Sequence, residues 1–295
     1  MKRVWRGVIF LFVIAIGVPL LFSGILSAAE SGSAEPAKIV QGGAVLTTAE
    51  SKRLIGKAVA QMPVVKNALA NGTIIIIKGT TTRYVAEEIT GQKIVPAEYV
   101  TGRIMAKGPE LLPKGKSINN VVLEKGKVLD IPLPDAVKKL KPGDVVMKGA
   151  NALDYKNKLA AGNIMVGPYL GFVPGPDGGT TGVTMPYIHA RKVNLIIPVG
   201  LEKQITGDIV DLTLKMREPM ESLTVLPSMW LLTGEIVTEL EAFKMLTGAT
   251  AFQANAGGVA GAEGGRWFVF RGTRDQVEKA LELAKSLKGE PPYTE

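Results

Sequence analysis

The sequence contains no cysteine and a single histidine, His189. The absence of cysteine excludes disulfide bonds, thiolate metal ligands and a cysteine nucleophile. One histidine cannot supply a multi-histidine zinc site, so a metal would need carboxylate ligands alone, and we expect neither a metal nor a cofactor. Aromatic residues make up only 6% of the chain, and no basic run is interleaved with them. Binding of nucleic acid is therefore not expected.

The chain is long and apolar enough to bury a sizeable core. Its 295 residues are 46% hydrophobic and 21% charged, which is close to the average of globular proteins. This length corresponds to one large domain or two smaller ones. The 34 glycines and 18 prolines follow no period, which excludes a collagen-like repeat. The net charge of +8 is mild and spread along the chain.

The N-terminal segment has the pattern of a membrane-targeting sequence. Residues 1–6 carry three positive charges, and residues 7–29 carry none. Ser27-Ala28-Ala29 is similar to a small-x-small cleavage site. An uncharged run of 23 residues is also long enough to span a bilayer.

Residues 1–29 are therefore predicted to be a cleaved signal peptide or a retained membrane anchor through residues 7–29, with a buried core helix as the third interpretation. Both leading interpretations keep the N-terminus cytoplasmic, since positive charge precedes the apolar run. They place the rest of the chain outside the cytoplasm, in a periplasm or at the cell surface. The small, polar start of residues 30–48 predicts a tether.

Residues 49–221 are predicted to form an α/β domain. Apolar spacing predicts a helix over residues 49–70 that is broken or kinked at Pro63. The run Thr73–Lys78 is apolar on both faces, which is typical of a buried parallel strand. Because such strands alternate with helices along this part of the chain, we expect an open, mostly parallel sheet with helices on both faces.

Residues 222–290 are predicted to form a second, smaller unit. Helices are expected at Glu235–Leu246 and Asp275–Leu287, with strands at Ala249–Ala254 and Trp267–Arg271 between them. This order fits a small ferredoxin-like α+β domain. Residues 291–295 are expected to be a tail.

Gly79-Thr80-Thr81-Thr82 lies between a predicted strand and a predicted helix. Free backbone N–H groups and the helix dipole make such a junction a site for anions, and the hydroxyls can donate hydrogen bonds. The alternative is an ordinary N-cap, in which Thr81 or Thr82 satisfies the first helical turn.

Two further segments follow the same logic. Asn151 and Asp154 come after a predicted strand, where Asp154 is a candidate base and Asn151 a candidate hydrogen-bonding group; the alternative is a plain turn. Gly178-Gly179-Thr180-Thr181 precedes a predicted helix and is a candidate anion cradle or a flexible glycine-rich loop. Glu202 also follows a predicted strand, although a solvated helix start is the favoured interpretation there.

Three segments resemble, in order, parts of type A ribose-5-phosphate isomerase. NGTIIIIKGTTTRYVAEEI is similar to the family's first strand, Gly-Thr-rich loop and helix. DVVMKGANALD resembles its strand ending in Gly-Ala-Asp-Glu-x-Asp, and DGGTTGVTMPYIHARKVNLIIPVGLEK its Lys-Gly-Gly-Gly loop, helix and strand. The wider resemblance is to the superfamily of sugar-phosphate isomerases, glucosamine-phosphate deaminases and CoA transferases.

The resemblance implies phosphate-binding hydroxyls at Thr80, Thr81 and Thr82, and places the second aspartate of the family motif on Asp154. Asn151 replaces the first aspartate. The isomerase base falls near Met185 or Pro186, neither of which can accept a proton, and an isomerase needs such a base. The nucleophilic glutamate of CoA transferases would correspond to Glu202 or Glu263.

Three functions remain open from the sequence. The first is an extracytoplasmic protein that binds a small anionic ligand, phosphorylated or carboxylated, on an isomerase-like fold. The second is an enzyme of altered chemistry, of isomerase or acyl-transferase type, with Asp154 as base. The third is a membrane-tethered assembly or structural protein, in which the glycine-rich residues 257–265 contact a second copy in a homo-oligomer.

Overall fold

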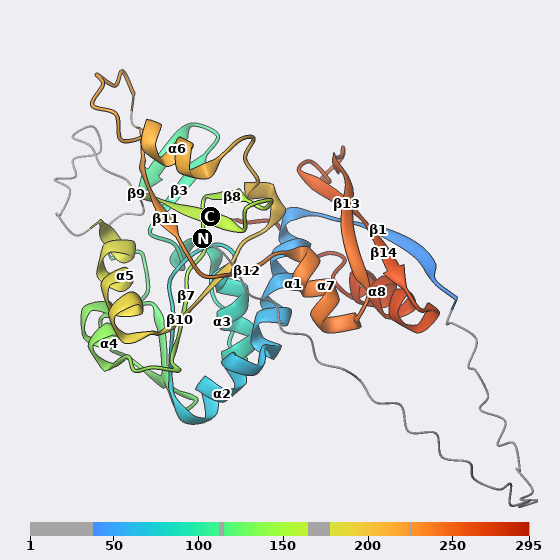
Figure 1. The fold of residues 1–295 in the computed structure, drawn as a ribbon, viewed down its shortest axis with the longest axis horizontal. Helices are drawn as coiled ribbons and strands as arrows, with labels where there is room; N and C mark the ends of the chain where they lie inside the picture. The colour runs from blue at the N-terminus through green and yellow to red at the C-terminus, as the bar shows by residue number, and fades with distance from the viewer. Residues whose placement is uncertain (1–37, 112–114, 165–177, 225, 295) are drawn as a thin grey trace, which may run out of the picture. The chain divides into compact units, whose positions relative to one another are not determined.

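Short, strongly apolar runs build the largest sheet of this protein. The computed structural model describes residues 38–111, 115–164, 178–224 and 226–294, which form a mixed α/β structure with eight α-helices in these ranges (Figure 1). The largest sheet has the strand order β12-β10-β7-β2-β5-β6. Its strands are β2 (Thr73–Ile76), β5 (Val121–Glu124), β6 (Lys127–Leu129), β7 (Val145–Met147), β10 (Asn194–Pro198) and β12 (Glu235–Val237). The β12-β10-β7-β2 half is parallel, whereas β5 and β6 are antiparallel.

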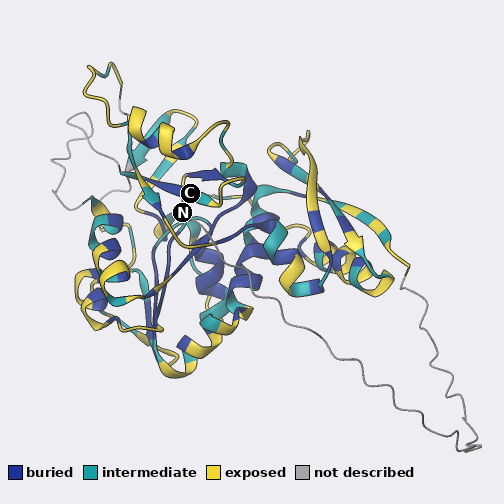
Figure 2. Ribbon diagram, in the orientation of Figure 1, coloured by how far each residue is buried: buried dark blue, intermediate teal, exposed yellow. Residues whose placement is uncertain are grey.

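Both faces of this sheet are covered, because alternate side chains of a strand point to opposite faces. Ile74 and Ile76 pack in one apolar cluster with residues of α1, α2 and α3. Ile75 and Ile77 pack in another that contains residues of α4 and α5. These helices are α1 (Thr48–Gln61), α2 (Pro63–Asn71), α3 (Thr82–Thr90), α4 (Leu133–Lys139) and α5 (Gly179–Arg191). Figure 2 shows the central strands as buried.

A three-stranded antiparallel sheet is formed by β1 (Val40–Leu46), β14 (Gly265–Gly272) and β13 (Thr250–Gly257). It is packed by α7 (Glu239–Thr247) and α8 (Arg274–Ser286). The ring of Phe243 in α7 lies 5.8 Å from that of Phe268 and 4.5 Å from that of Phe270. Gly42 in β1 allows α8 to approach, since a Cβ there would lie 2.9 Å from a methyl carbon of Val277.

The remaining elements are short. β8 (Ala152–Asp154), β9 (Leu159–Ile164) and β11 (Ser228–Leu232) form an antiparallel sheet, and β3 (Gly102–Met105) pairs with β4 (Gly108–Leu111). Helix α6 (Ile209–Lys215) and the single 3₁₀ turns at Pro96–Glu98 and Leu201–Lys203 complete the described elements.

Arg53 joins α1 to α3 and to the chain after α8. Its guanidinium contacts Glu87 at 2.6 Å, Glu88 at 3.0 Å and Glu290 at 2.9 Å. Arg83 also pairs with Glu87, at 2.6 Å. These charges satisfy one another, so this buried cluster has a structural explanation.

The structure differs from the sequence prediction in the extent of the tether and of the second domain. Val40–Leu46, expected within the tether, form β1, because Ala44 and Leu46 pack against the core that α7 and α8 cover. Residues 222–290 do not form a sheet of their own alone, since two of their strands pair with strands of the preceding segment: β11 pairs with β9 and β12 with β10. Residues 38–295 accordingly cluster as one compact unit.

The helix predicted over Glu235–Leu246 is wrong at its start. Residues 235–237 form β12, and α7 begins only after Thr238, whose side chain and that of Glu241 form a capping box. Strand β12 forms because Ile236 and Val237 can complete the edge of the large sheet beside β10. Among the described residues no helix is long and apolar enough to cross a membrane; the predicted anchor over residues 7–29 lies outside them.

Candidate functional site

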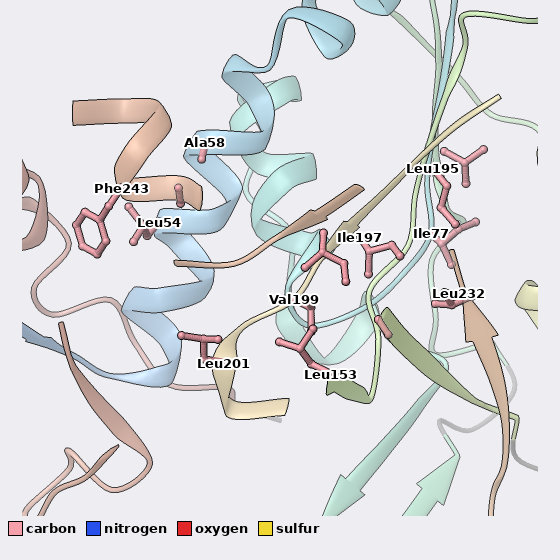
Figure 3. Packing of buried hydrophobic residues seen from close by; sticks show 14 of the residues in the cluster. Leu54, Ala58, Ile77, Leu153, Leu195, Ile197, Val199, Leu201, Leu232 and Phe243 are labelled. Carbon is pink, nitrogen blue, oxygen red and sulfur yellow. The ribbon is translucent and has the colours of Figure 1, made fainter. Parts of the chain in front are cut away.

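The carboxyl ends of four parallel strands meet at one edge of the large sheet. Polar residues follow each of these strands: Lys78–Thr82 after β2, Lys148–Asn151 after β7, Glu202 and Lys203 after β10, and Thr238 and Glu239 after β12. This edge is where open α/β sheets bind ligands. Figure 3 shows the apolar residues Leu153, Val199 and Leu201 lying close together next to the ends of these strands.

Lys52 of α1 reaches the loop after β2. Its Nζ donates a hydrogen bond of 3.2 Å to Thr80 Oγ1 and lies 3.8 Å from Glu202 Oε1. The side chains of Lys52 and Glu202 are each only 13% exposed. Burial lowers the pKa of Lys52, and Glu202 opposes this effect without cancelling it.

Lys148, directly after β7, makes the same kind of contact with the start of α5. Its Nζ donates a hydrogen bond of 3.3 Å to Thr180 Oγ1. Burial lowers the pKa of Lys148 to about 8. Within residues 38–164 and 178–294, excepting 112–114 and 225, no carboxylate lies within ion-pair distance of this amine. Gly162 lies beside this lysine, and a Cβ there would be in ordinary contact with Lys148 Cε, at 3.7 Å.

The helices that follow these threonines have no side-chain cap. Neither α3 nor α5 has an N-cap hydrogen bond from a side chain, whereas α1, α7 and α8 each begin with a capping box. In α3 the backbone N–H groups of Arg83 and Tyr84 already donate to the carbonyl oxygens of Gly79 and Thr81, so the uncapped first turn of α5 is the better candidate for binding an outside acceptor. The buried Lys148 lies beside the start of α5, and the partly buried Lys52 lies beside the start of α3.

Glu202 and Glu239 form a second feature of the same edge, which we call the carboxyl pair. Glu239 is fully buried at the first position of α7, and its Oε2 accepts a hydrogen bond of 2.9 Å from the backbone N–H of Leu201. Its Oε1 and both carboxylate oxygens of Glu202 are buried without a hydrogen-bond partner among the described residues. Burial, followed by the charge of Glu202, raises the pKa of Glu239 to about 7.

No protein-family model, curated protein or solved structure matches this chain.

Two of the predicted anion-binding threonines are the partners of the buried lysines, and their neighbours have other roles. Thr80 and Thr180 accept the lysine hydrogen bonds. Thr82 instead donates to the carbonyl oxygen of Ile77 at 2.6 Å, so its hydroxyl holds the turn. Thr81 and Thr181 are buried, at 7% and 2% exposure.

The predicted glycines are explained by backbone geometry. Gly178 and Gly179 have φ angles of 65° and 62°, which favour glycine because a Cβ is strained there. Gly79 lies under the Thr82 hydroxyl, with 3.0 Å between Thr82 Oγ1 and the place of a Cβ. Asp177, which precedes the second glycine motif, lies outside the described residues.

Asp154 and Asn151 are engaged in local hydrogen bonds. Asp154 accepts from the backbone N–H and the side-chain Nδ2 of Asn157, at 3.0 and 2.8 Å, and these bonds lower its pKa. Asn151 Oδ1 accepts a 3.0 Å hydrogen bond from the backbone N–H of Asn163. A carboxylate with a lowered pKa is a weaker base. The catalytic roles of both residues stay predictions.

Sequence reasoning missed Lys52, Lys148 and Glu239. The sequence could have indicated Lys148 as a site residue, since a lysine directly after the buried run Val145–Met147 has little access to water. Glu239 follows Thr238, and Thr238 with Glu241 has the spacing of a capping box, which placed the glutamate at a helix start. Lys52 carried no signal, because an interior helix lysine is ordinarily solvated.

A surface hollow of about 420 Å³ between β12, α7 and β13 is a weaker candidate. Its walls include Tyr155, Glu241 and Met245. Glu241 already accepts hydrogen bonds from Tyr155 at 2.8 Å and from Lys158 at 2.9 Å. The Glu241 carboxylate thus has partners within the protein, unlike the oxygens of the carboxyl pair. Among the described residues no three metal-ligating side chains lie together.

Proposed function

We propose that this protein binds a small anionic ligand, phosphorylated or carboxylated, at the carboxyl edge of its six-stranded sheet, and that it does so outside the cytoplasm. One observation carries the proposal. Two lysines, the buried Lys148 and the partly buried Lys52, each donate a hydrogen bond to a threonine at the start of a helix that lacks a side-chain cap.

The physical basis is the cost of burying positive charge. A buried ammonium group is unfavourable unless an anion or several acceptors compensate it. Within the described residues, the side chain of Lys148 has one hydrogen-bond partner, the Thr180 hydroxyl. A phosphate or carboxylate here would receive the charge of Lys148 and the N–H groups and dipole of α5.

The proposal extends to the scaffold. The parallel β12-β10-β7-β2 half supports an open, mostly parallel sheet with helices on both faces. The β13-β14 hairpin followed by α8 supports a ferredoxin-like arrangement near the C-terminus. Both features agree with the resemblance to the isomerase and CoA-transferase superfamily. The location outside the cytoplasm is supported by the pattern of residues 1–29.

An enzyme of altered chemistry is the second candidate, and the carboxyl pair favours it. Glu239, with a pKa of about 7, can exchange a proton near neutral pH. It is better placed for acid–base chemistry than Asp154, whose pKa is lowered by hydrogen bonds to Asn157. Binding of the anion comes first in either function.

The test is a thermal-shift screen of the full-length protein with phosphate, sulfate, sugar phosphates, acyl-CoA esters and simple carboxylic acids. A ligand at about 100 times its Kd adds roughly 2.7 kcal/mol to stability. We expect a shift with at least one class of anion, and its loss in Lys148→Met. The control is Lys156→Met, which changes an exposed lysine. An equal shift in Lys148→Met, or no shift with any compound, contradicts the proposal.

A further inference from the structure

The amine of Lys148 has fewer partners than an ordinary buried ammonium group. Lys148 is 9% exposed. Over residues 38–111, 115–164, 178–224 and 226–294, its Nζ makes one hydrogen bond, to Thr180 Oγ1 at 3.3 Å, and no ion pair. An ammonium group has three protons to donate, and burial disfavours its charge when no anion compensates it. The surroundings of Lys148 therefore favour the neutral amine, which is a nucleophile.

Lys52 is the comparison within the same chain. It makes the same kind of contact, with Thr80 at 3.2 Å, but Glu202 lies 3.8 Å from its amine. Lys158 is paired as well, with Glu241 at 2.9 Å. A carboxylate at this distance stabilises the ammonium form. Lys148 differs from both lysines in the absence of an acid beside it in the described ranges, and a lysine attacks a carbonyl only without its proton.

The end of the Lys148 side chain lies next to a residue that reaches the surface. Gly162 in β9 has no side chain, and the place of its Cβ lies 3.7 Å from Lys148 Cε and 3.8 Å from Thr181 Oγ1. Trp230 pairs with Gly162 across the two strands, and its ring lies 3.3 Å from the place of a Cβ on Gly178. Trp230 is 40% exposed. The amine and the start of α5 therefore lie together beside a partly exposed aromatic side chain.

The first turn of α5 offers donors to an anion close to this amine. In the described part of the chain, Gly182 is the first residue of this turn whose N–H group donates to a backbone oxygen, that of Gly178 at 3.3 Å. The N–H groups before it are those that a helix start offers to an anion. Thr180 carries one of these groups and also the hydroxyl bonded to Lys148. A ligand held by this turn therefore has its next atoms close to the Lys148 amine.

We propose that Lys148 forms an imine with a small 2-oxo acid whose carboxylate is bound at the start of α5. This inference rests on the proposed function and names its substrate class. In a 2-oxo acid the carbonyl carbon is bonded directly to the carboxylate, which matches an amine that contacts a threonine of the same helical turn. In a sugar phosphate, several bonds separate the carbonyl from the phosphate, and the match is poorer.

The reaction consumes one amine and one carbonyl and releases one water. The lone pair of the neutral Nζ attacks the carbonyl carbon, a C–N bond forms, and the C=O π electrons move to the oxygen. The resulting carbinolamine loses this oxygen as water, with two protons that come from the amine, and a C=N bond remains. The Thr180 hydroxyl is placed to pass a proton, since it accepts a hydrogen bond from Nζ. Burial lowers the pKa of Lys148 to about 8, so neutral amine is present near pH 7.5.

The experiment treats the full-length protein with pyruvate and sodium cyanoborohydride at pH 7.5, which reduces an imine to a stable secondary amine. Peptide mass mapping then gives the rate of labelling at each lysine. We expect Lys148 to be labelled about tenfold faster than the exposed Lys156, because more of its amine is neutral. Lys52, which has Glu202 beside it, should also be labelled more slowly than Lys148. The comparison is made within one unaltered chain, so it does not depend on the folding of a variant.

Sulfate and one pair of variants locate the reaction at the start of α5. Sulfate should slow the labelling of Lys148 and leave that of Lys156 unchanged, because it competes for the same N–H groups. Thr180→Val should slow the labelling of Lys148 about fivefold, the value of one ordinary hydrogen bond. Thr184→Val is the matched control, since the Thr184 hydroxyl donates to the backbone oxygen of Thr180 within α5.

The failure of this inference is distinguishable from the failure of the proposed function, because a thermal shift with sulfate reports anion binding separately. A shift with sulfate, together with labelling of Lys148 that is no faster than that of Lys156, overturns the imine and leaves anion binding intact. Fast labelling of Lys148 that sulfate does not slow overturns the binding of the carboxylate at α5. Absence of both the shift and the fast labelling overturns both proposals.

Discussion

The two lysine–threonine contacts at the sheet edge have similar lengths and different charged neighbours. Lys52 and Lys148 donate to Thr80 and Thr180 at 3.2 and 3.3 Å. Lys52 lies beside a glutamate, whereas in the described part of the chain the partner of the Lys148 side chain is a hydroxyl. Two lysines with similar hydrogen bonds can therefore differ in what they contribute to the stability of the fold. Burial lowers the pKa of both lysines, and at Lys52 the charge of Glu202 offsets part of that effect.

The largest expected effect comes from removing each lysine. Lys52→Met should destabilise the protein by roughly 2–3 kcal/mol, because it leaves Glu202 without the cation beside it. This loss is below the range measured for fully buried ion pairs, because the side chains of Lys52 and Glu202 are each 13% exposed. Lys148→Met should leave stability unchanged or raise it by roughly 1–2 kcal/mol, because the cost of burying an ammonium disappears.

Urea denaturation at pH 7 measures both changes. The double variant Lys52→Met with Glu202→Gln should recover most of the lost stability, since the uncompensated charge is then gone. Equal losses in the two single lysine variants would show that their surroundings do not differ in energy.

A somewhat smaller difference is expected in the dependence of stability on pH. The folded pKa of Glu239 is raised from 4.5 to about 7, so its contribution is fully present below pH 4.5 and is lost as pH rises through 7, about 3 kcal/mol in all. The folded pKa of Lys148 is lowered from 10.5 to about 8, so the unfolded chain binds more protons between these values and stability rises with pH there, by a similar amount.

These two opposite slopes predict a minimum of stability between pH 7 and 8 in denaturation curves. Glu239→Gln should flatten the acid side, and Lys148→Met the alkaline side. If one substitution flattened both sides, the two sites would not be independent.

The smallest expected effect comes from removing the threonine hydroxyls that accept the two lysine hydrogen bonds. Thr80→Val and Thr180→Val should each weaken sulfate binding about fivefold, the value of one ordinary hydrogen bond. Calorimetry at pH 6.5 measures this change, and Thr184→Val, which removes a hydroxyl bonded to the α5 backbone, is the control. No loss in either variant would mean that the hydroxyls only position the lysines.

Much of the fold could be predicted because local pattern and tertiary placement agree. The predicted strand Thr73–Lys78 corresponds to the buried strand β2 over Thr73–Ile76, which is parallel to β7 and antiparallel to β5, and the helix predicted over residues 49–70 breaks at Pro63. The helix predicted over Asp275–Leu287 corresponds to α8. In each case the apolar pattern is clear, and a Gly or Pro residue lies close to the end of the element.

The missed parts depend on contacts between distant segments. Strand β1 contains Gly42 and Gly43, which weaken any local strand signal, and it forms because it pairs with β14. At the site, Thr80 and Thr180 could be found because they follow strands. Lys52 could not, because only the packing of α1 against α3 brings it to Thr80.

The pairing of β1 with β14 constrains the order in which the protein can fold. Val40 pairs with Gly272 and Leu46 with Arg266. The first described strand therefore cannot pair until β14, the last strand of the chain's described part, has been formed. Contacts at such separation form slowly, because a long loop must close before they bring any gain. During synthesis β1 therefore stays unpaired until almost the whole chain exists. A chain that stops before residue 265 would leave Phe243 without the aromatic partners that bury it.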